Sequence, residues 1–293
     1  MDAGTFTSSM MLAILPEIGL VVLAALLLLV DLLWKPQQRR WFGWLTAAGV
    51  LVIMALALIF SRPTEPTLIW GGMVRFDMSG FVFRMLFMTG AGLTALFAAH
   101  TDSIKTHGEF YALLLVSTLG MSLMASAADL VMLFLAIETT SIPLYVLAGF
   151  ILRDQKSVEA GIKYLLFGSM ASAILLYGFS LLYGVTGTTS LYDLGSALQA
   201  SNLPVVMVAG ILGLLLVGFA FKVSAVPFHF WAPDVYQGAP TPVAGFLSTA
   251  SKAAGFAALM RVMVVAFPDQ MTLWNIMIAI VAAASMLVEN DHK

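Results

Sequence analysis

The sequence predicts an all-α fold, a polytopic bundle of transmembrane helices, and three observations lead to this prediction. Hydrophobic residues make up 60% of the chain and charged residues only 10%, whereas a soluble domain carries about a quarter charged residues. The mean hydropathy is +0.96. Apolar runs of about 20 residues, the length that crosses roughly 30 Å of hydrocarbon, recur from one end of the sequence to the other.

Nine apolar runs follow one another, and each is expected to form a membrane span. They cover approximately residues 10–34, 41–60, 77–99, 109–127, 128–150, 159–183, 204–235, 241–266 and 271–288, and the seventh is discontinuous. Residues 61–77 are rich in proline and glycine, so we expect an ordered loop outside the membrane. The polar stretch before Pro204 is expected to hold a short surface helix.

Composition also excludes several classes of function. The formal charge of -2 gives no basic surface for nucleic acid, and the absence of cysteine excludes thiol chemistry and iron–sulfur ligation in this sequence. Glycine-rich nucleotide fingerprints are absent. A bis-histidine haem needs two histidines near the spans, and of His100, His107, His229 and His292 only His229 lies near one. We therefore expect no cofactor or metal in this chain.

The basic residues of the short loops predict an orientation, because cytoplasmic loops carry an excess of lysine and arginine. Six basic residues fall on one side and two on the other: Lys35, Arg39, Arg40, Lys105, Arg153 and Lys156 against Arg62 and Arg75. The N-terminus is therefore expected outside, which is periplasmic in a bacterial inner membrane. No positively charged region precedes the first apolar run, so we expect this span to stay in the mature protein.

Four charged residues lie inside or at the ends of spans and have competing explanations. The sequence favours snorkelling of Arg84 to the interface over a buried ion pair, and it favours snorkelling of Arg261 as well. Glu159 and Lys163 are four residues apart on one helix face, so a simple interfacial ion pair competes with a functional role for Lys163.

Glu138 lies near the centre of the fifth span, and Pro143 follows about one turn later. The proline leaves the carbonyl of Thr139 without its helical donor, so an acceptor is free next to the carboxylate. A carboxylate at that depth either takes up a proton or finds a cation. A neutral, hydrogen-bonded structural glutamate is the alternative.

Residues 218–255 place Lys222 and Lys252 in apolar helical runs with almost no other charge. Lysine at such depth is costly and usually lines an ion or proton path, although a buried cation that only pins helices is the alternative. Pro227 should open the helix next to Lys222. His229 follows seven residues after Lys222, and a proton relay and a structural role stay equally open for it.

These residues together predict a path for protons. We expect Glu138 and Lys222 to approach each other across one helix–helix contact. We also expect a hydrated cavity from Lys222 to Lys252, lined by Ser248, Thr249 and Ser251, with His229 and the hinge at 231–236 at its cytoplasmic mouth.

Three segments also resemble a known family, the N subunits of bacterial NADH-quinone oxidoreductase (respiratory complex I). These subunits belong to a wider antiporter-like proton-translocating family that includes subunits of cation/proton antiporters. The segments are IETTSIPLYVLAGF, EAGIKYLLFGSMASAILLYGFSLLYGVTGTTSLYDL and FKVSAVPFHFWAPDVYQGAPTPVAGFLSTASKAAGFAAL, and the similarity extends over essentially the whole chain to about Ser285.

The resemblance implies a role for each candidate residue in proton transfer. Glu138 resembles the fifth-helix glutamate of the family's Glu–Lys pair, and Lys222 resembles the lysine of its broken seventh helix. Lys252 resembles the eighth-helix residue that passes protons onward, His229 the polar cluster at the cytoplasmic mouth, and Lys163 a less central sixth-helix lysine.

The resemblance further implies a proton-translocating subunit that couples quinone reduction to pumping and has no redox centre of its own. NADH, FMN, iron–sulfur clusters and quinone are then expected in partner subunits, beside other membrane subunits of the oxidoreductase. A subunit of a cation/proton antiporter and a truncated structural remnant are the alternatives.

The family continues into a second, inverted repeat, whereas this sequence stops after the ninth span, so we expect the first, proton-loading half of that fold. Residues 1–108 are expected to form N-terminal helices, 109–266 a five-helix proton-channel unit, and 267–293 the start of the second repeat.

Overall fold

The computed structural model describes residues 8–35 and 37–290, and within these ranges nine helices are long and apolar enough to cross a membrane, as expected. The outer ends of the expected three-part division, residues 1–7 and 291–293, lie outside the described residues. The helices and strands, in order, are α1 (Ser8–Ala13), α2 (Leu15–Leu33), a 3-10 turn (Arg39–Trp41), α3 (Phe42–Phe60), β1 (Thr67–Ile69), β2 (Val74–Phe76), α4 (Met78–Ala98), α5 (Gly108–Ser126), α6 (Leu130–Ala148), α7 (Gln155–Thr186), α8 (Leu191–Ala200), α9 (Val205–Val223), α10 (Trp231–Gly238), α11 (Thr241–Ser248), α12 (Ala250–Ala266) and α13 (Met271–Asn290).

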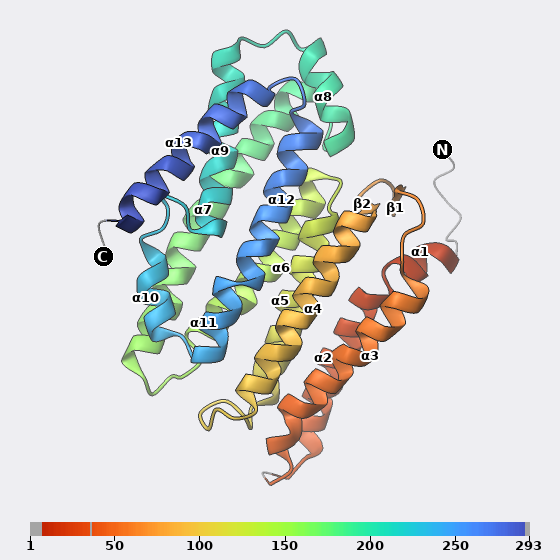
Figure 1. The fold of residues 1–293 in the computed structure, drawn as a ribbon, viewed down its shortest axis with the longest axis vertical. Coiled ribbons are helices and arrows are strands. Elements are labelled where there is room, and N and C mark those ends of the chain that lie inside the picture. The colour runs from red at the N-terminus through yellow and green to blue at the C-terminus, as the bar shows by residue number, and fades with distance from the viewer. Residues whose placement is uncertain (1–7, 36, 291–293) are drawn as a thin grey trace.

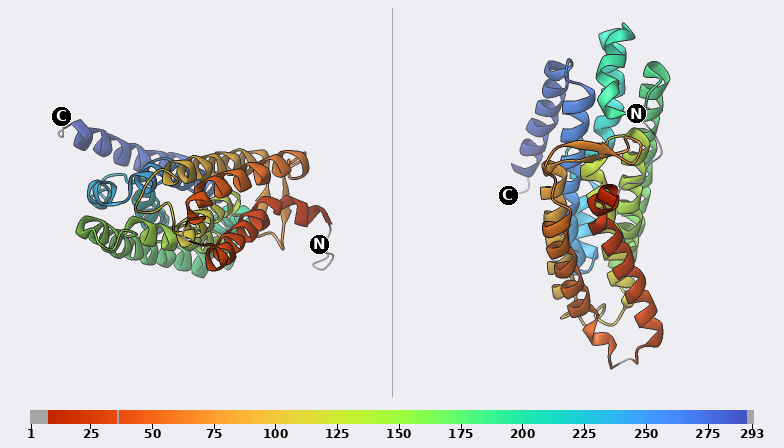
Figure 2. Two further views of the ribbon diagram at one scale, coloured as in Figure 1. Left: turned by 90° about the horizontal axis from the view of Figure 1, so that it is seen from below. Right: turned by 90° about the vertical axis from the view of Figure 1, so that its right-hand side faces the viewer.

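The long helices run roughly side by side and form one elongated bundle (Figure 1). Helix α5 is the most deeply enclosed, because α2, α4, α6 and α12 all pack against it. A Cβ on Gly120 would lie 2.5 Å from the backbone nitrogen of Thr140, so glycine is what lets α5 and α6 approach this closely. Helix α13 lies on the outside of the bundle (Figure 2).

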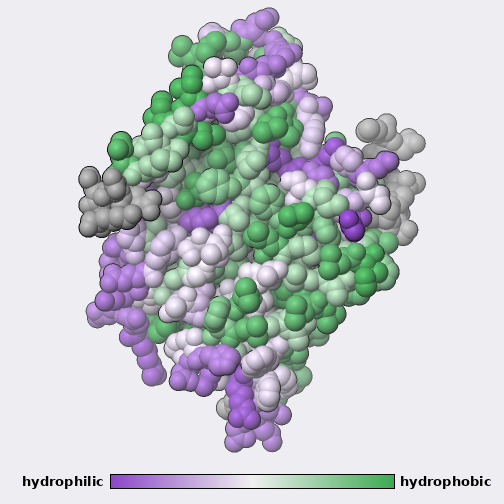
Figure 3. All heavy atoms as spheres, in the orientation of Figure 1, coloured by the Kyte–Doolittle hydropathy of each residue, from purple (hydrophilic) through white to green (hydrophobic). Residues whose placement is uncertain are grey.

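The outer surface of the bundle is apolar along much of its length. On the face seen in Figure 3, hydrophobic side chains cover large areas over the long helices, and hydrophilic ones gather toward the ends. Large apolar residues are exposed along α2, α3, α7 and α13, among them Leu29, Leu51, Leu166 and Ile280. Such exposure is expected of helices that face lipid.

The expected ordered loop at residues 61–77 is confirmed and contains a small β-hairpin. Strands β1 and β2 are antiparallel, with Thr67 opposite Phe76, and the turn runs through Trp70, Gly71 and Gly72, all at positive φ. The expected surface helix before Pro204 is also confirmed, as α8. Isolated bridges join Val74 to Ala127 and Asp129 to Ser190, so both loops are tied to the same end of α5 and α6.

The expectation that Arg84 snorkels is wrong, and the alternative of a buried ion pair is correct. Arg84 is only 3% exposed, and its Nε lies 2.9 Å from Oε1 of Glu17 on α2. The guanidinium also donates to Ser122 Oγ at 3.2 Å and to the carbonyl of Ala13 at 3.1 Å. The partners come from distant parts of the sequence, which is why position along the span alone suggested the interface.

The expectation that Arg261 snorkels is wrong as well. Its guanidinium binds both carboxylate oxygens of Asp77, at 2.9 and 3.0 Å, and donates to the Ala125 carbonyl at 2.8 Å. This bidentate geometry is the strong form of an arginine–carboxylate pair. It fixes α12 to the start of α4 and the end of α5.

The seventh span is broken next to Lys222, as the sequence predicts. Helix α9 ends at Val223, and Ser224 adopts the left-handed conformation (φ 58°, ψ 41°) before the chain turns into α10. The eighth span is interrupted too, at Thr249 between α11 and α12, which the sequence reasoning did not predict. The hydroxyls of Ser248 and Thr249 both donate to the Gly245 carbonyl, and such side-chain bonds compete with the helical backbone ladder.

Candidate functional site

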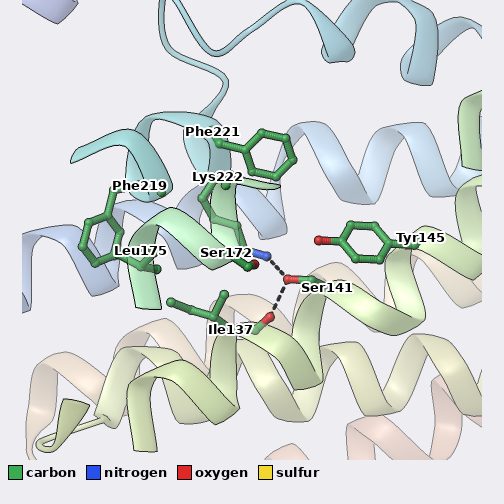
Figure 4. Close-up of a pocket in the computed structure, with 10 residues that line it drawn as sticks. Ile137, Ser141, Tyr145, Ser172, Leu175, Phe219, Phe221 and Lys222 are labelled. Carbon is green, nitrogen blue, oxygen red and sulfur yellow. Dashed lines mark hydrogen bonds between the residues drawn. The ribbon is translucent and has the colours of Figure 1, made fainter. Parts of the chain in front are cut away.

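Lys222 lies in the last turn of α9 and points into the bundle, where it is 5% exposed. Its Nζ donates to Ser141 Oγ on α6 at 2.5 Å, and Ser141 in turn donates to the carbonyl of Ile137 at 2.5 Å (Figure 4). A buried ammonium is tolerated only when hydrogen bonds replace its water. Ser141 therefore supplies part of that replacement.

Glu138 lies one turn before Ser141 on the same face of α6, so the expected approach of this helix to Lys222 is confirmed. The Glu138 carboxylate is within electrostatic reach of the Lys222 ammonium, although no direct salt bridge joins them in the described part of the chain. Its Oε1 is shielded from solvent and has no hydrogen-bond partner there. Ser141 thus binds the buried ammonium, and the unsatisfied carboxylate oxygen of Glu138 lies one turn away on the same helix.

A cavity of about 10 Å³ adjoins Lys222, which is room for roughly one water molecule. Three hydroxyl-bearing residues line it with Lys222: Ser141, Tyr145 and Ser172. The Tyr145 hydroxyl points toward Ser141 and Lys222 (Figure 4). It occupies the place that a Cβ on Gly168 of α7 would take, so glycine makes room for this hydroxyl. The lysine therefore faces a small cavity between α6, α7 and α9, whose mostly apolar lining carries three hydroxyl groups.

Lys252 lies in the first turn of α12 and reaches the C-terminal end of α9. Its Nζ donates to the backbone carbonyl of Lys222 at 3.2 Å and to Ser224 Oγ. The same Nζ lies 4.4 Å from the ring centroid of Trp231 and 5.9 Å from that of Tyr236. The two lysines are thus neighbours through the backbone of residue 222, while their ammonium groups face different partners.

The expected lining of a cavity between the lysines is wrong. Ser248 and Thr249 are exposed and bond within their own helix, and only Ser251 is buried, at 2%. The cavity next to Lys222 instead opens between α6, α7 and α9. Ser248 and Thr249, the two exposed residues, lie at the break between α11 and α12.

Aromatic side chains form a wall behind Lys252. Trp231 stacks on Tyr164 with centroids 4.5 Å apart and planes 10° apart, and it lies 5.0 Å from Phe221. Phe221 and Trp231 also line an apolar cavity of about 160 Å³, together with Phe167, Met170, Ala171, Val217, Pro227, Phe228 and Phe230. Neither Lys222 nor Lys252 is among the residues that line this apolar cavity.

Lys163 does not join the cluster around Lys222. Its Nζ lies 2.6 Å from Oε1 of Glu159 and 2.5 Å from Oδ2 of Asp234, and the side chain is 35% exposed. The interfacial ion pair with Glu159 is present, and Asp234 adds a second partner on α10. In this structure Lys163 ties the hinge helix α10 to α7.

His229 lies in the hinge between α9 and α10. Its Nδ1 is buried and makes no hydrogen bond to the described residues, and its ring lies 4.4 Å from that of Phe230. No contact between His229 and a lysine is seen among the described residues, so the geometry leaves both the proton relay and the structural role open. Within the described ranges, no three histidine, aspartate or glutamate side chains gather as metal ligands would.

Ser141, Tyr145 and Ser224 were not among the residues expected from the sequence, and Trp231 was expected in the hinge but not as a partner of Lys252. A signal for two of them was present, because Ser141 and Tyr145 lie three and seven residues after Glu138 and therefore share its helix face. Ser224 and Trp231 became partners of Lys252 only through the shape of the hinge.

Comparison with known proteins gives a consistent picture. Residues 127–291 match the family described as NADH:quinone oxidoreductase/Mrp antiporter, TM. The chain is 43% identical to NADH-quinone oxidoreductase subunit N of Desulfovibrio desulfuricans, over 95% of this chain and 56% of that protein. It is 44% identical to subunit N of Moorella thermoacetica, over 94% and 57%. The chain thus spans about half the length of the curated relatives it matches.

Solved structures agree with the sequence comparison. A chain of respiratory complex I from Thermus thermophilus, solved with bound aureothin, matches with a TM-score of 0.71 and 38% identity, over 88% of this chain and 55% of that one. A chain of the Mrp complex of a Dietzia species matches with a TM-score of 0.75 at 24% identity, over 97% and 53%, and it supports the fold alone. With more than half of its residues matching the family and the same antiporter-like helix bundle, the chain belongs to the NADH:quinone oxidoreductase/Mrp antiporter transmembrane family, among relatives named subunit N.

Proposed function

We propose that this chain forms the proton-loading site of a proton-translocating membrane subunit of NADH-quinone oxidoreductase. The observation that carries the proposal is the pair of intramembrane lysines at the break of α9, joined through the Lys222 carbonyl. A charge buried at this depth is costly, and membrane proteins keep such residues mainly along ion or proton paths.

Each candidate residue has a place in the proposed path. Glu138 acts as a carboxylate that exchanges a proton with Lys222, and Ser141, one turn from Glu138, holds the Lys222 ammonium. The adjoining cavity has room for a single water that would support that transfer, because a proton crosses a gap of several ångströms only through water or hydroxyl groups. Lys252 then takes the proton toward the next part of the path. Lys163 and His229 stay candidates at the hinge end.

The redox chemistry of such an oxidoreductase would belong to partner subunits. The proposal places NADH, FMN, iron–sulfur clusters and quinone in those partners, and the membrane subunits of the same complex beside this chain. Its support is the naming of the relatives as NADH-quinone oxidoreductase subunit N. Enzyme activity is accordingly proposed for the assembled complex.

We further propose a bacterial inner membrane as the location, with the N-terminus in the periplasm. The basic loop residues support this orientation, because Lys35, Lys105 and Arg153 fall on the side of the bundle opposite to the hairpin that carries Arg75. Cysteine substitutions at exposed positions in the loops, probed with a membrane-impermeant thiol reagent, test this, and labelling of the hairpin only from the cytoplasmic side would overturn it.

The test of the proposed function is purification of the tagged chain from its host membrane, followed by mass spectrometry and proton-pumping assays of what copurifies. We expect subunits of an NADH-quinone oxidoreductase and NADH-driven pumping that Lys222→Met abolishes while the assembly stays intact. Copurification of cation/proton antiporter subunits without redox subunits would contradict the proposal and indicate an antiporter subunit instead. Arg62→Met, at an exposed residue outside the spans, is the matched control.

A further inference from the structure

We propose that Ser224 is a positioning residue that holds the Lys252 ammonium against the C-terminal end of α9. The inference rests on the proposed role of the two lysines in proton transfer and adds a residue to it. Ser224 Oγ accepts a hydrogen bond from Lys252 Nζ, and the carbonyl of Lys222 accepts another at 3.2 Å. The hydrogen bond between Ser224 and Lys252 was not predicted from the sequence.

The backbone at Ser224 is built to present the hydroxyl. Ser224 ends α9 in the left-handed conformation, where its amide bonds the Phe221 carbonyl at 3.1 Å and the next amide bonds the Ala220 carbonyl at 2.8 Å. Glycine adopts this conformation without steric cost, whereas serine does not. Such strain is typically retained at functional sites, and here the only group that serine adds to glycine is the CH₂–OH that meets Lys252.

The surroundings of Lys252 match the three donors of an ammonium group. Two donors have oxygen acceptors, the Lys222 carbonyl and Ser224 Oγ, and the third faces the Trp231 ring, 4.4 Å away. Tyr164 and Phe221 hold the indole from behind. The carbonyl end of a helix also favours a cation. We call the three groups that contact the ammonium, which are the Lys222 carbonyl, Ser224 Oγ and the Trp231 ring, the ammonium cage.

The cage stabilises a charge without a counter-ion. Within the described residues no carboxylate forms a salt bridge with Lys252, and the other titratable groups that face it are Lys222 from α9 and Tyr236 from α10. The Lys252 ammonium is therefore stabilised by neutral partners alone. Loss of one hydrogen-bond acceptor should accordingly weaken its binding strongly. Ser224 thereby fixes the position of the Lys252 ammonium group relative to Lys222.

Two substitutions that both tolerate the left-handed backbone separate the hydroxyl from the turn. Ser224→Gly relaxes the backbone and deletes the acceptor, whereas Ser224→Asn keeps the conformation and offers a carbonyl oxygen. The full chain is reconstituted in nanodiscs with lysine labelled at ¹⁵Nζ. Its seven lysines give a simple spectrum, in which loss of one signal in Lys252→Arg assigns Lys252.

The measured quantity is the exchange rate of the Lys252 ammonium protons with water. We expect Ser224→Gly to raise it about tenfold, Ser224→Asn to leave it within about threefold of wild type, and Ser248→Gly, whose hydroxyl does not touch Lys252, to leave it unchanged. An unchanged rate in Ser224→Gly overturns the proposal. The proposal is also overturned if the exchange rate rises as much in Ser224→Asn as in Ser224→Gly. A hydrogen-bond acceptor at residue 224 would then not be enough to hold the ammonium.

The exchange measurement needs no pumping, so it fails or succeeds independently of the proposed function. In the assembled complex, proton pumping should fall in Ser224→Gly and be rescued in Ser224→Asn. Loss of pumping in both variants with a normal exchange rate in Ser224→Asn would contradict a positioning role and indicate that the hydroxyl itself carries the proton.

Discussion

The substitution Arg84→Met removes one partner of the most deeply buried ion pair and should destabilise the bundle. The pair joins α4 to α2 at 2.9 Å, and its side chains are 4% and 6% exposed. Methionine fills much of the volume but leaves the Glu17 carboxylate without its cation, and the Ala13 carbonyl keeps only the Ser61 hydroxyl of its two side-chain donors. Breaking a buried pair in this way costs about 3–5 kcal/mol, a large share of the 5–15 kcal/mol that holds a typical protein folded.

A second substitution shows whether the charge is the cause. Adding Glu17→Gln removes the uncompensated carboxylate and keeps an oxygen that can accept from Ser122, so we expect the double variant to recover to within about 1–2 kcal/mol of wild type. Unfolding by increasing dodecyl sulfate in mixed micelles, followed by tryptophan fluorescence, measures this. A double variant as unstable as Arg84→Met, or a single variant within about 1 kcal/mol of wild type, would show that the unpaired Glu17 charge is not the cause of the instability.

Three further predictions concern the candidate site. Lys222→Ala and Glu138→Gln should each lower proton pumping more than they lower assembly, measured by acidification assays beside native gels, because each removes an ionisable carrier and little packing. Gly168→Ala should lower pumping and cost about 1–3 kcal/mol in micelle unfolding, since its Cβ meets the hydroxyl of Tyr145; unchanged values would show that the tyrosine moves freely. Lys163→Ala should leave unfolding nearly unchanged, because its ion pairs are exposed, and should loosen α10, seen as faster amide hydrogen exchange there.

The fold class, the membrane spans and the charged candidate residues could all be predicted from the amino-acid sequence. Nine apolar runs correspond to the nine membrane-length helices of the described chain, because the apolar length needed to cross hydrocarbon is a local property of the sequence. The break near Lys222 was equally local, since Pro227 excludes a continuous helix there. The three-part division of the chain stays a prediction.

The residues that each charged side chain contacts on neighbouring helices could be identified only from the tertiary structure. Arg84 and Arg261 appear near span ends in the sequence, yet both are paired with carboxylates far away in the chain. The depth of a residue can be counted along a helix, whereas the facing residue depends on how the helices are rotated and packed. Helix rotation is set by many contacts at once, for example where Gly120 lets α5 meet α6.

The candidate site shows the same division. Its charged residues, Glu138, Lys222 and Lys252, could be found from the sequence because a charge in an apolar run is conspicuous and costly. Their neutral partners, Ser141 and Ser224, could not, because a serine in a membrane helix carries no such signal and bonds wherever the fold places an acceptor or donor. Which charges lie within the spans can therefore be predicted from the sequence, whereas the hydroxyls and carbonyls that replace the water lost by those charges depend on how the helices pack.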